Sequence, residues 1–272
     1  GRLEWYYQQV HHDVWDYDNG QQPILFDMEV DGEPIKALAQ ANKNAWLYIL
    51  NRETGEPVHP IIETPVPTET EREGEQPYPT QPIPHKANGE RMEPVAPVIP
   101  ENIPPEDLEG KRLVPQYTPL AQDIIFAPGM GGGASYAPIA YSPETGLLYV
   151  TAIGRPYNTR RGPRGFFSAY DPTTAELVWR QIFEGYGQSG PVVTAGGVVF
   201  VGAGSNIAGY FYAYDAATGE ELWKFNTGSG VFASPSVYMA DGEQFITVAS
   251  GGGSRGRRGG DLILSFALPQ RR

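Results

Sequence analysis

The sequence predicts an all-β fold, a β-propeller of four-stranded antiparallel blades. Its composition favours turns and strands, because glycine and proline account for 33 and 26 of the 272 residues and aromatic residues reach 12%. No long window shows helical periodicity with good capping. A turn-containing motif also recurs after 44 residues, which is the length of one propeller blade.

The repeat is clearest in the second half of the chain. Residues 169–179 read AYDPTTAELVW, and residues 213–223 read AYDAATGEELW. We expect a strand to end at the Ala-Tyr-Asp, a tight turn in which the Asp accepts backbone hydrogen bonds, and a next strand that carries the Trp. Gly219 suits a turn position with positive φ. The Trp is predicted to be a packing anchor between neighbouring blades.

A weaker copy of the motif occupies residues 48–59, YILNRETGEPVH. In it, Asn51 replaces the Asp, Gly55 matches Gly219, and His59 replaces the Trp. Apolar runs next to turn signals predict further strands. These runs lie at 146–153, 197–201, 244–249 and 262–266, and the third follows an Asp-Gly hairpin signal.

The chain begins inside a repeat. Gly1 and Trp5 have the same spacing as Gly219 and Trp223. A natural domain seldom begins at such a turn. We therefore expect residues to be missing upstream, through truncation or because another chain supplies them.

Composition divides the chain into three segments. Residues 1–59 and 120–272 have propeller character, whereas residues 60–119 hold 14 of the 26 prolines and show little periodicity. This middle segment is expected to be a long, partly extended insertion. It is either a linker or a cover over one face of the propeller or a partner surface. The remaining residues, roughly 210, suffice for about four blades.

Charge and cysteine content exclude several classes of function. The net charge is −12, which makes nucleic acid an unfavourable partner. The absence of cysteine removes disulfides, thiolate metal sites and thiol nucleophiles. No apolar run is long enough to span a membrane, and the first residues do not have the pattern of a signal peptide.

The segment richest in reactive side chains is 11–19, HHDVWDYDN. If it is extended, Asp16 and Asp18 lie on one face, where two carboxylates can raise one another's pKa or share a hard cation. Such a pair suits a general base beside a metal ion. The alternative is an Asp-rich turn that caps backbone amides. His11 and His12 lack a third ligand at zinc-site spacing.

One lysine and two Gly-rich segments are further candidates for a functional role. Lys43 precedes a predicted strand, where a lysine is usually solvated, but a functional lysine there would pair with an anionic cofactor. The Gly-rich segment 129–136 lacks the features of a phosphate loop, and its glycines are expected to let backbones approach closely. Segment 251–260 is expected to be an exposed loop whose arginines could contact a membrane or a partner.

With these residues in view, the sequence resembles the dehydrogenases that depend on pyrroloquinoline quinone (PQQ), especially the membrane-associated quinoprotein glucose dehydrogenases and their soluble relatives. The matching stretches span nearly the whole chain: HHDVWDYD (11–18), QPILFDMEVDGEPIKAL (22–38), YILNRETGEPVHP (48–60), PYPTQPIP (77–84), TAGGVVFVGA (194–203), AYDAATGEELWKFNTGSG (213–230) and GGDLILSFALP (259–269). The resemblance implies about half of an eight-bladed quinoprotein propeller. PQQ would lie in its central channel against Ca²⁺, with a lanthanide as the alternative.

The resemblance also implies roles for individual residues. Asp16 occupies the place of the catalytic base, and Lys43 that of a basic residue that contacts the quinone oxygens of PQQ. Asp18 stands where some relatives have an extra metal-binding Asp, so Asp16 and Asp18 are the expected metal ligands. Ser135 lies near the place of an Asn close to PQQ.

The implied function is oxidation of an aldose, polyol or alcohol in the periplasm, with electrons passed to ubiquinone or a cytochrome. Membrane association would depend on upstream sequence. The expected partner is the missing N-terminal half of the propeller or a separate chain. The alternative is a non-catalytic propeller of the same repeats that acts as a scaffold, and it predicts loss of Asp16 and Lys43.

Overall fold

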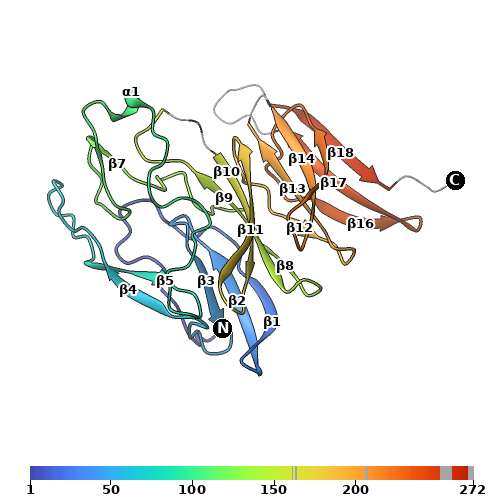
Figure 1. The fold of residues 1–272 in the computed structure, drawn as a ribbon, viewed down its shortest axis with the longest axis horizontal. Coiled ribbons are helices and arrows are strands. Elements are labelled where there is room, and N and C mark those ends of the chain that lie inside the picture. The colour runs from blue at the N-terminus through green and yellow to red at the C-terminus, as the bar shows by residue number, and fades with distance from the viewer. Residues whose placement is uncertain (161, 163, 206–207, 252–258, 269–272) are drawn as a thin grey trace.

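Four antiparallel sheets, which we call blades 1 to 4, follow one another along the computed structural model, which describes residues 1–160, 162, 164–205, 208–251 and 259–268 (Figure 1). Their strands are as follows: blade 1, β1 (Ile24–Val30), β2 (Glu33–Ala41) and β3 (Leu47–Asn51); blade 2, β8 (Ala140–Ser142), β9 (Leu147–Gly154), β10 (Arg164–Asp171) and β11 (Glu176–Glu184); blade 3, β12 (Val192–Val193), β13 (Val198–Gly204), β14 (Gly209–Asp215) and β15 (Glu221–Asn226); blade 4, β16 (Ser236–Ala240), β17 (Glu243–Gly251) and β18 (Asp261–Ala267). The propeller prediction is confirmed, and the described chain is a partial propeller.

The strands expected from the sequence are present. β9, β13, β17 and β18 cover the four apolar runs. β16 and β17 are joined by a two-residue turn, Asp241 and Gly242, with φ of 48° and 80°. Two positive φ values are typical of the hairpin turn that Asp-Gly predicts. Most of the Arg-containing segment 251–260 lies outside the described residues.

Three of the clusters that form the core of the described residues lie between neighbouring blades, and a further cluster, with Trp15, Trp46 and Phe126, lies outside these interfaces. Each interface has its own cluster of buried apolar side chains, in which a fully buried Val, Leu, Ile or Phe contributes on the order of 1.5–3 kcal/mol by leaving water. Members from the two sides of the three interfaces include Ala39 and Leu148, Phe167 and Val201, and Phe211 and Val248.

The Trp of the repeat anchors one blade to the next, as expected. The Trp179 indole donates a hydrogen bond to the Ala216 carbonyl at 3.1 Å and lies on Gly219, where a Cβ would come within 2.6 Å of the ring. Trp5 lies on Gly55 in the same way. Glycine is therefore required at these turns both for its positive φ, 74° at Gly219, and for the space that the indole needs.

His59 takes the place of the Trp between blades 1 and 2. Its Nε2 donates to the Pro172 carbonyl at 2.7 Å, and Ala175 occupies the glycine position with a φ of 61°. Because an imidazole is smaller than an indole, the Ala175 Cβ fits beside it. The weak third copy of the motif is thus a true blade contact with a smaller anchor.

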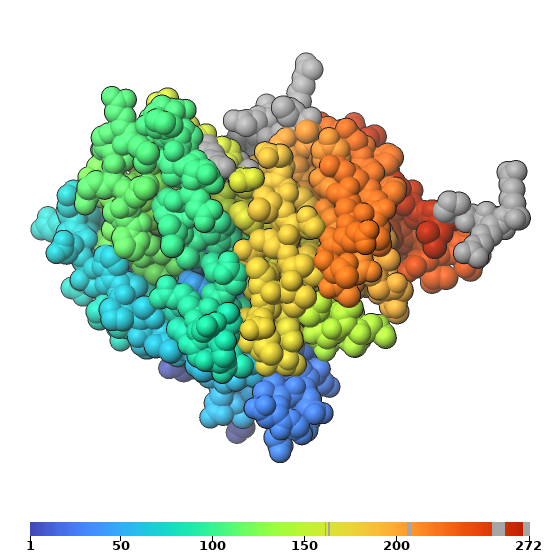
Figure 2. All heavy atoms as spheres, viewed as in Figure 1, coloured from blue at the N-terminus to red at the C-terminus, as the bar shows by residue number. Residues whose placement is uncertain are grey.

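The Pro-rich segment 60–119 forms no part of the blades. It contains the hairpin of β4 (Ile61–Pro65) and β5 (Thr80–Pro84), the four-residue α1 (Pro105–Leu108), and β6 (Arg112–Leu113), which pairs with β7 (Ile124–Ile125) in parallel. In Figure 2 this segment, in cyan and green, covers much of blade 1. Within the described ranges, no helix has the length and apolar character that crossing a membrane requires.

Candidate functional site

The segment that precedes β1 carries the two candidate aspartates on an irregular backbone. Trp15 and Tyr17 are fully buried, and their side chains donate to the carbonyls of Thr118 at 2.7 Å and Pro128 at 2.6 Å. Asp16 lies between them with a φ of 65°. The segment is therefore not extended, because Asp16 makes a left-handed turn between the two buried aromatic residues.

Lys43 lies in the short loop that joins β2 to β3. The N–H of Asn42 donates to the Trp46 carbonyl at 3.0 Å, and Ala45 has a φ of 67°, so the loop is tight. The Lys43 side chain is 11% exposed, so it is not the solvated lysine that is usual before a strand. The aliphatic part of the Lys43 side chain packs against the protein, and its ammonium faces the Asp-rich segment.

The structure brings Lys43, Asp16 and Asp18 together. Lys43 Nζ lies 2.9 Å from Asp16 Oδ2 and donates to Asp18 Oδ1 at 2.8 Å. The two carboxylates remain open to solvent, with side-chain exposures of 53% and 65%. One buried cation thus holds two accessible carboxylates, although they are 27 and 25 residues away in the sequence.

The ion pairs set the charge of this cluster. Burial lowers the pKa of Lys43, but hydrogen bonds to Asp18 and Asp16 outweigh it and leave the pKa above its usual value. The hydrogen bond from Lys43 lowers the pKa of the Asp18 carboxyl below its usual range. At neutral pH both Lys43 and Asp18 are therefore ionised.

The Gly-rich segment 129–136 packs directly on the Lys43 loop. A Cβ at Gly133 would overlap the Lys43 carbonyl, and the N–H of Ala134 donates to the Asn42 carbonyl at 3.0 Å. This close backbone approach is the role expected for the glycines. Ser135 follows this contact and is half-buried. Its carbonyl oxygen lies near Asp18, because a Cβ at Gly20 would come 3.7 Å from that oxygen and 3.8 Å from Asp18 Oδ2.

A buried network of amide side chains supports the Lys43 loop. Its residues are not among the candidate site residues named from the sequence. The Gln9 side-chain oxygen accepts hydrogen bonds from Asn42 and Asn19, both at 3.1 Å. The Tyr48 hydroxyl donates to the Gln9 carbonyl at 3.0 Å. The polar run at the end of β2, Gln-Ala-Asn-Lys-Asn, is the signal that could have identified it, because buried amides need partners.

His11 and His12 contact the insertion. His11 Nε2 lies 2.9 Å from Glu63 Oε1, and the Tyr78 ring lies between His11 and His12, with centroids 4.6 and 5.3 Å away. Within the part of the chain that the structure describes, no group of three or more His, Cys, Asp or Glu side chains could hold a metal ion.

Residues 60–119 also contact the Lys43 loop. Gln116 Nε2 donates to the Asn44 carbonyl at 2.6 Å, and the N–H of Val95 donates to the Ala45 carbonyl at 2.9 Å. The insertion therefore packs against the loop that carries Lys43, so it does more than connect strands.

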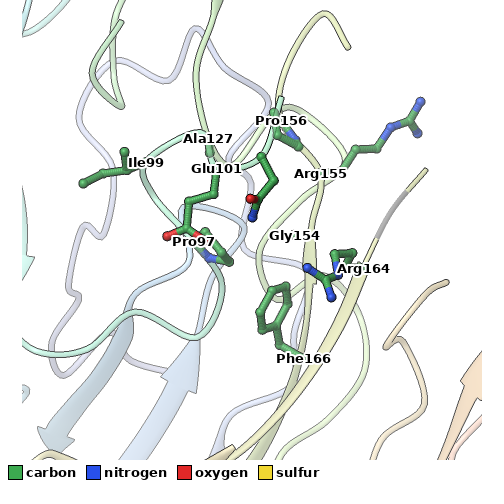
Figure 3. Close-up of a pocket in the computed structure, with 10 residues that line it drawn as sticks. Pro97, Ile99, Glu101, Ala127, Gly154, Arg155, Pro156, Arg164 and Phe166 are labelled. Carbon is green, nitrogen blue, oxygen red and sulfur yellow. The ribbon is translucent and has the colours of Figure 1, made fainter. Parts of the chain in front are cut away.

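A separate pocket lies against β9 and β10 (Figure 3). Its lining includes Pro97, Glu101, Arg164 and Phe166, and Arg155 at its rim points away from it. Asp16, Lys43 and Ser135 are not among its lining residues, so it is distinct from the cluster above.

Comparisons with known proteins show the family and the fold. A family model described as "PQQ: Glucose/ethanol/alcohol dehydrogenase, beta-propeller domain" matches residues 1–164 and 183–246. The quinoprotein ethanol dehydrogenase of Pseudomonas putida is 30% identical in an alignment 300 residues long. The alignment covers 96% of this chain and 42% of that protein. The quinoprotein glucose dehydrogenase of Escherichia coli is 27% identical, with coverage of 99% and 43%.

Among solved structures, the quinohemoprotein alcohol dehydrogenase from Comamonas testosteroni matches with a TM-score of 0.68 and 24% identity, over 100% of this chain and 42% of that one. This likeness shows a shared fold. The chain spans less than half the length of these relatives. From its match to the family model, the chain belongs to the PQQ-dependent glucose/ethanol/alcohol dehydrogenase family and comprises part of its β-propeller domain.

Proposed function

We propose that the chain supplies the base and a cofactor-binding lysine of a PQQ-dependent dehydrogenase that oxidises the hydroxyl of an aldose, polyol or alcohol. The observation that supports this most is the contact of Lys43 with both Asp16 and Asp18. A scaffold propeller has no use for a buried lysine paired with two exposed carboxylates, so the enzyme is the better explanation.

The residues present fit PQQ, an anionic ortho-quinone. Lys43 offers a nearly buried ammonium, which binds quinone or carboxylate oxygens strongly because water competes little there. Bound PQQ supplies the hydride acceptor. Lys43 would stabilise the negative charge that develops on the quinone oxygens, which is the usual task of a fixed donor at a reacting carbonyl.

Asp16 would accept the proton of the substrate hydroxyl. Its carboxylate is accessible, and Asp16 Oδ2 lies 2.9 Å from Lys43 Nζ, where a carboxylate can act as a base. Ser135 would lie beside the cofactor, as its position next to the Gly133 contact suggests.

Asp16 and Asp18 would also provide oxygen ligands to a metal cation. Ca²⁺ is the cation we propose, with a lanthanide as the alternative, since both prefer carboxylate oxygens. Two carboxylates are too few for Ca²⁺, which takes six to eight oxygen ligands. The other ligands would come from the partner that completes the propeller, either an N-terminal half or a separate chain.

We further propose that electrons pass to ubiquinone or a cytochrome and that the protein works in the periplasm. Names of relatives support both an alcohol and a sugar as the substrate class, since ethanol and glucose dehydrogenases occur among them.

Dye-linked dehydrogenase activity tests the proposal. The complete propeller, reconstituted with PQQ and Ca²⁺, is assayed against aldoses and primary alcohols, with Asp16→Asn as the matched variant. We expect oxidation of at least one class by the wild type and a loss of on the order of 10²–10⁴-fold in the variant. A folded, PQQ-loaded wild type without activity on either class would refute the function.

A further inference from the structure

The Asp13 carboxylate holds the backbone on both sides of Asp16. Oδ1 accepts the N–H of Trp15 at 2.9 Å, and Oδ2 accepts the N–H of Tyr17 at 2.7 Å. Both oxygens are thus used, each by one of the two residues that flank Asp16. Hydrogen bonds to an ionised carboxylate are about twice as strong as those between neutral groups.

Asp16 needs such a support because of its backbone conformation. Its φ of 65° lies in the left-handed region, which residues other than glycine seldom adopt unless the surroundings fix them. In an extended conformation, the Asp16 carboxylate would not keep its present direction. The contact with Lys43 at 2.9 Å therefore depends on the turn.

The two neighbours of Asp16 are also anchored through their side chains. Trp15 and Tyr17 are 0% and 1% exposed and hydrogen-bonded to Thr118 and Pro128. These contacts fix the depth of the segment, whereas Asp13 fixes the curvature of the backbone between the two anchors. The combination keeps Asp16 at the surface and beside Lys43.

We propose that Asp13 is the positioning residue of the catalytic base Asp16. This inference rests on the proposed function, because it assigns a catalytic consequence to the turn. Asp13 holds the carboxylate of Asp16 at the geometry in which it meets both Lys43 and the substrate hydroxyl.

Two substitutions remove this support in steps. Asp13→Asn keeps one oxygen and loses one of the two hydrogen bonds, whereas Asp13→Ala loses both. Asp215→Ala is the matched control, because Asp215 accepts the N–H groups of Ala217 and Thr218 in a similar turn far from the site. All variants are made in the complete, PQQ-loaded protein.

Two measurements are needed, steady-state kinetics and amide hydrogen exchange of the peptide 13–19 by mass spectrometry. For Asp13→Ala we expect kcat to fall about 10- to 100-fold, with KM within about twofold, because a small misplacement of a reacting group costs that much. The Trp15 and Tyr17 amides should exchange faster. Asp13→Asn should lie between Asp13→Ala and the wild type, and Asp215→Ala should change neither quantity.

A wild-type kcat in folded Asp13→Ala would overturn the proposal, as would unchanged exchange in peptide 13–19. If Asp13→Ala fails to fold, the same criteria apply to Asp13→Asn. Failure of the proposed function has a different signature, since the folded, PQQ-loaded wild type would then oxidise neither class of substrate. In that case hydrogen exchange in the Asp13 variants still decides whether Asp13 holds the turn.

Discussion

The indole ring of Trp179 in blade 2 lies directly on Gly219 in blade 3, where a Cβ would come within 2.6 Å of the ring. Gly219→Ala is therefore expected to destabilise the protein in two ways. The left-handed φ costs an alanine roughly 1–2 kcal/mol, and overpacking against the indole adds roughly 1–3 kcal/mol.

Gly146→Ala is the matched control for this substitution. Gly146 has a similar φ of 69°, but a Cβ there would meet nothing within 4 Å. The free energy of unfolding, measured with urea, should fall more for Gly219→Ala than for Gly146→Ala. Equal losses of unfolding free energy in the two variants would mean that the Trp179 indole does not require glycine at position 219.

The His59 and Ala175 pair predicts a compensating double substitution. His59→Trp alone should destabilise the protein, because the indole would meet the Ala175 Cβ. Adding Ala175→Gly recreates the Trp and Gly pair of the other blades and should recover at least about 1 kcal/mol. A double-mutant cycle measures this coupling, and strictly additive effects would contradict the equivalence of the three contacts.

Glu63 gives the protein an acid-sensitive contact. Burial raises the pKa of Glu63, but hydrogen bonds from His11 and Thr80 outweigh it and leave the pKa below its usual 4.5. A carboxyl with a lowered folded-state pKa stabilises the protein above its unfolded pKa, and this contribution disappears as the pH falls through the folded-state pKa. The contribution is at most about 1 kcal/mol, since the carboxylate is half exposed.

Glu63→Gln should therefore lower the melting temperature at pH 7 and have progressively less effect below about pH 4.5. Thermal unfolding of both proteins across pH 3 to 7 checks this. A difference that widens toward low pH would show that the hydrogen bonds do not favour the ionised carboxylate.

Lys43→Met tests the role of the buried ammonium. We expect kcat to fall on the order of 10²–10³-fold, because a fixed donor at the quinone oxygens is lost. Lys36→Met is the control, since Lys36 pairs with Glu53 at 2.7 Å on the exposed side of blade 1. An equal effect of the two substitutions would refute a specific role for Lys43.

The propeller could be predicted from the sequence because its signals are local. Asp171 and Asp215 end strands, and Trp179 and Trp223 follow at a fixed spacing, so each repeat carries its own turn chemistry. Even the replacement of the Trp by His59 leaves the order of strand, turn and strand intact.

The geometry of the site could not be predicted in the same way. The left-handed turn at Asp16 depends on Trp15 and Thr118, which are 103 residues apart, and the burial of Lys43 depends on the fold of the Gly-rich segment over it. Residue types can indicate a base and a cofactor-binding lysine. Their contact arises only from long-range packing, which no local pattern encodes.

The most direct test of the central claim is single-turnover reduction of bound PQQ, followed by its absorbance after ethanol or glucose is added. Wild type and Asp16→Asn are compared at equal PQQ content, and Asn suits this test because it tolerates the left-handed turn. We expect both proteins to bind PQQ, and the variant to reduce it on the order of 10²–10⁴-fold more slowly. Reduction at the wild-type rate in Asp16→Asn would contradict the role of Asp16 as the base.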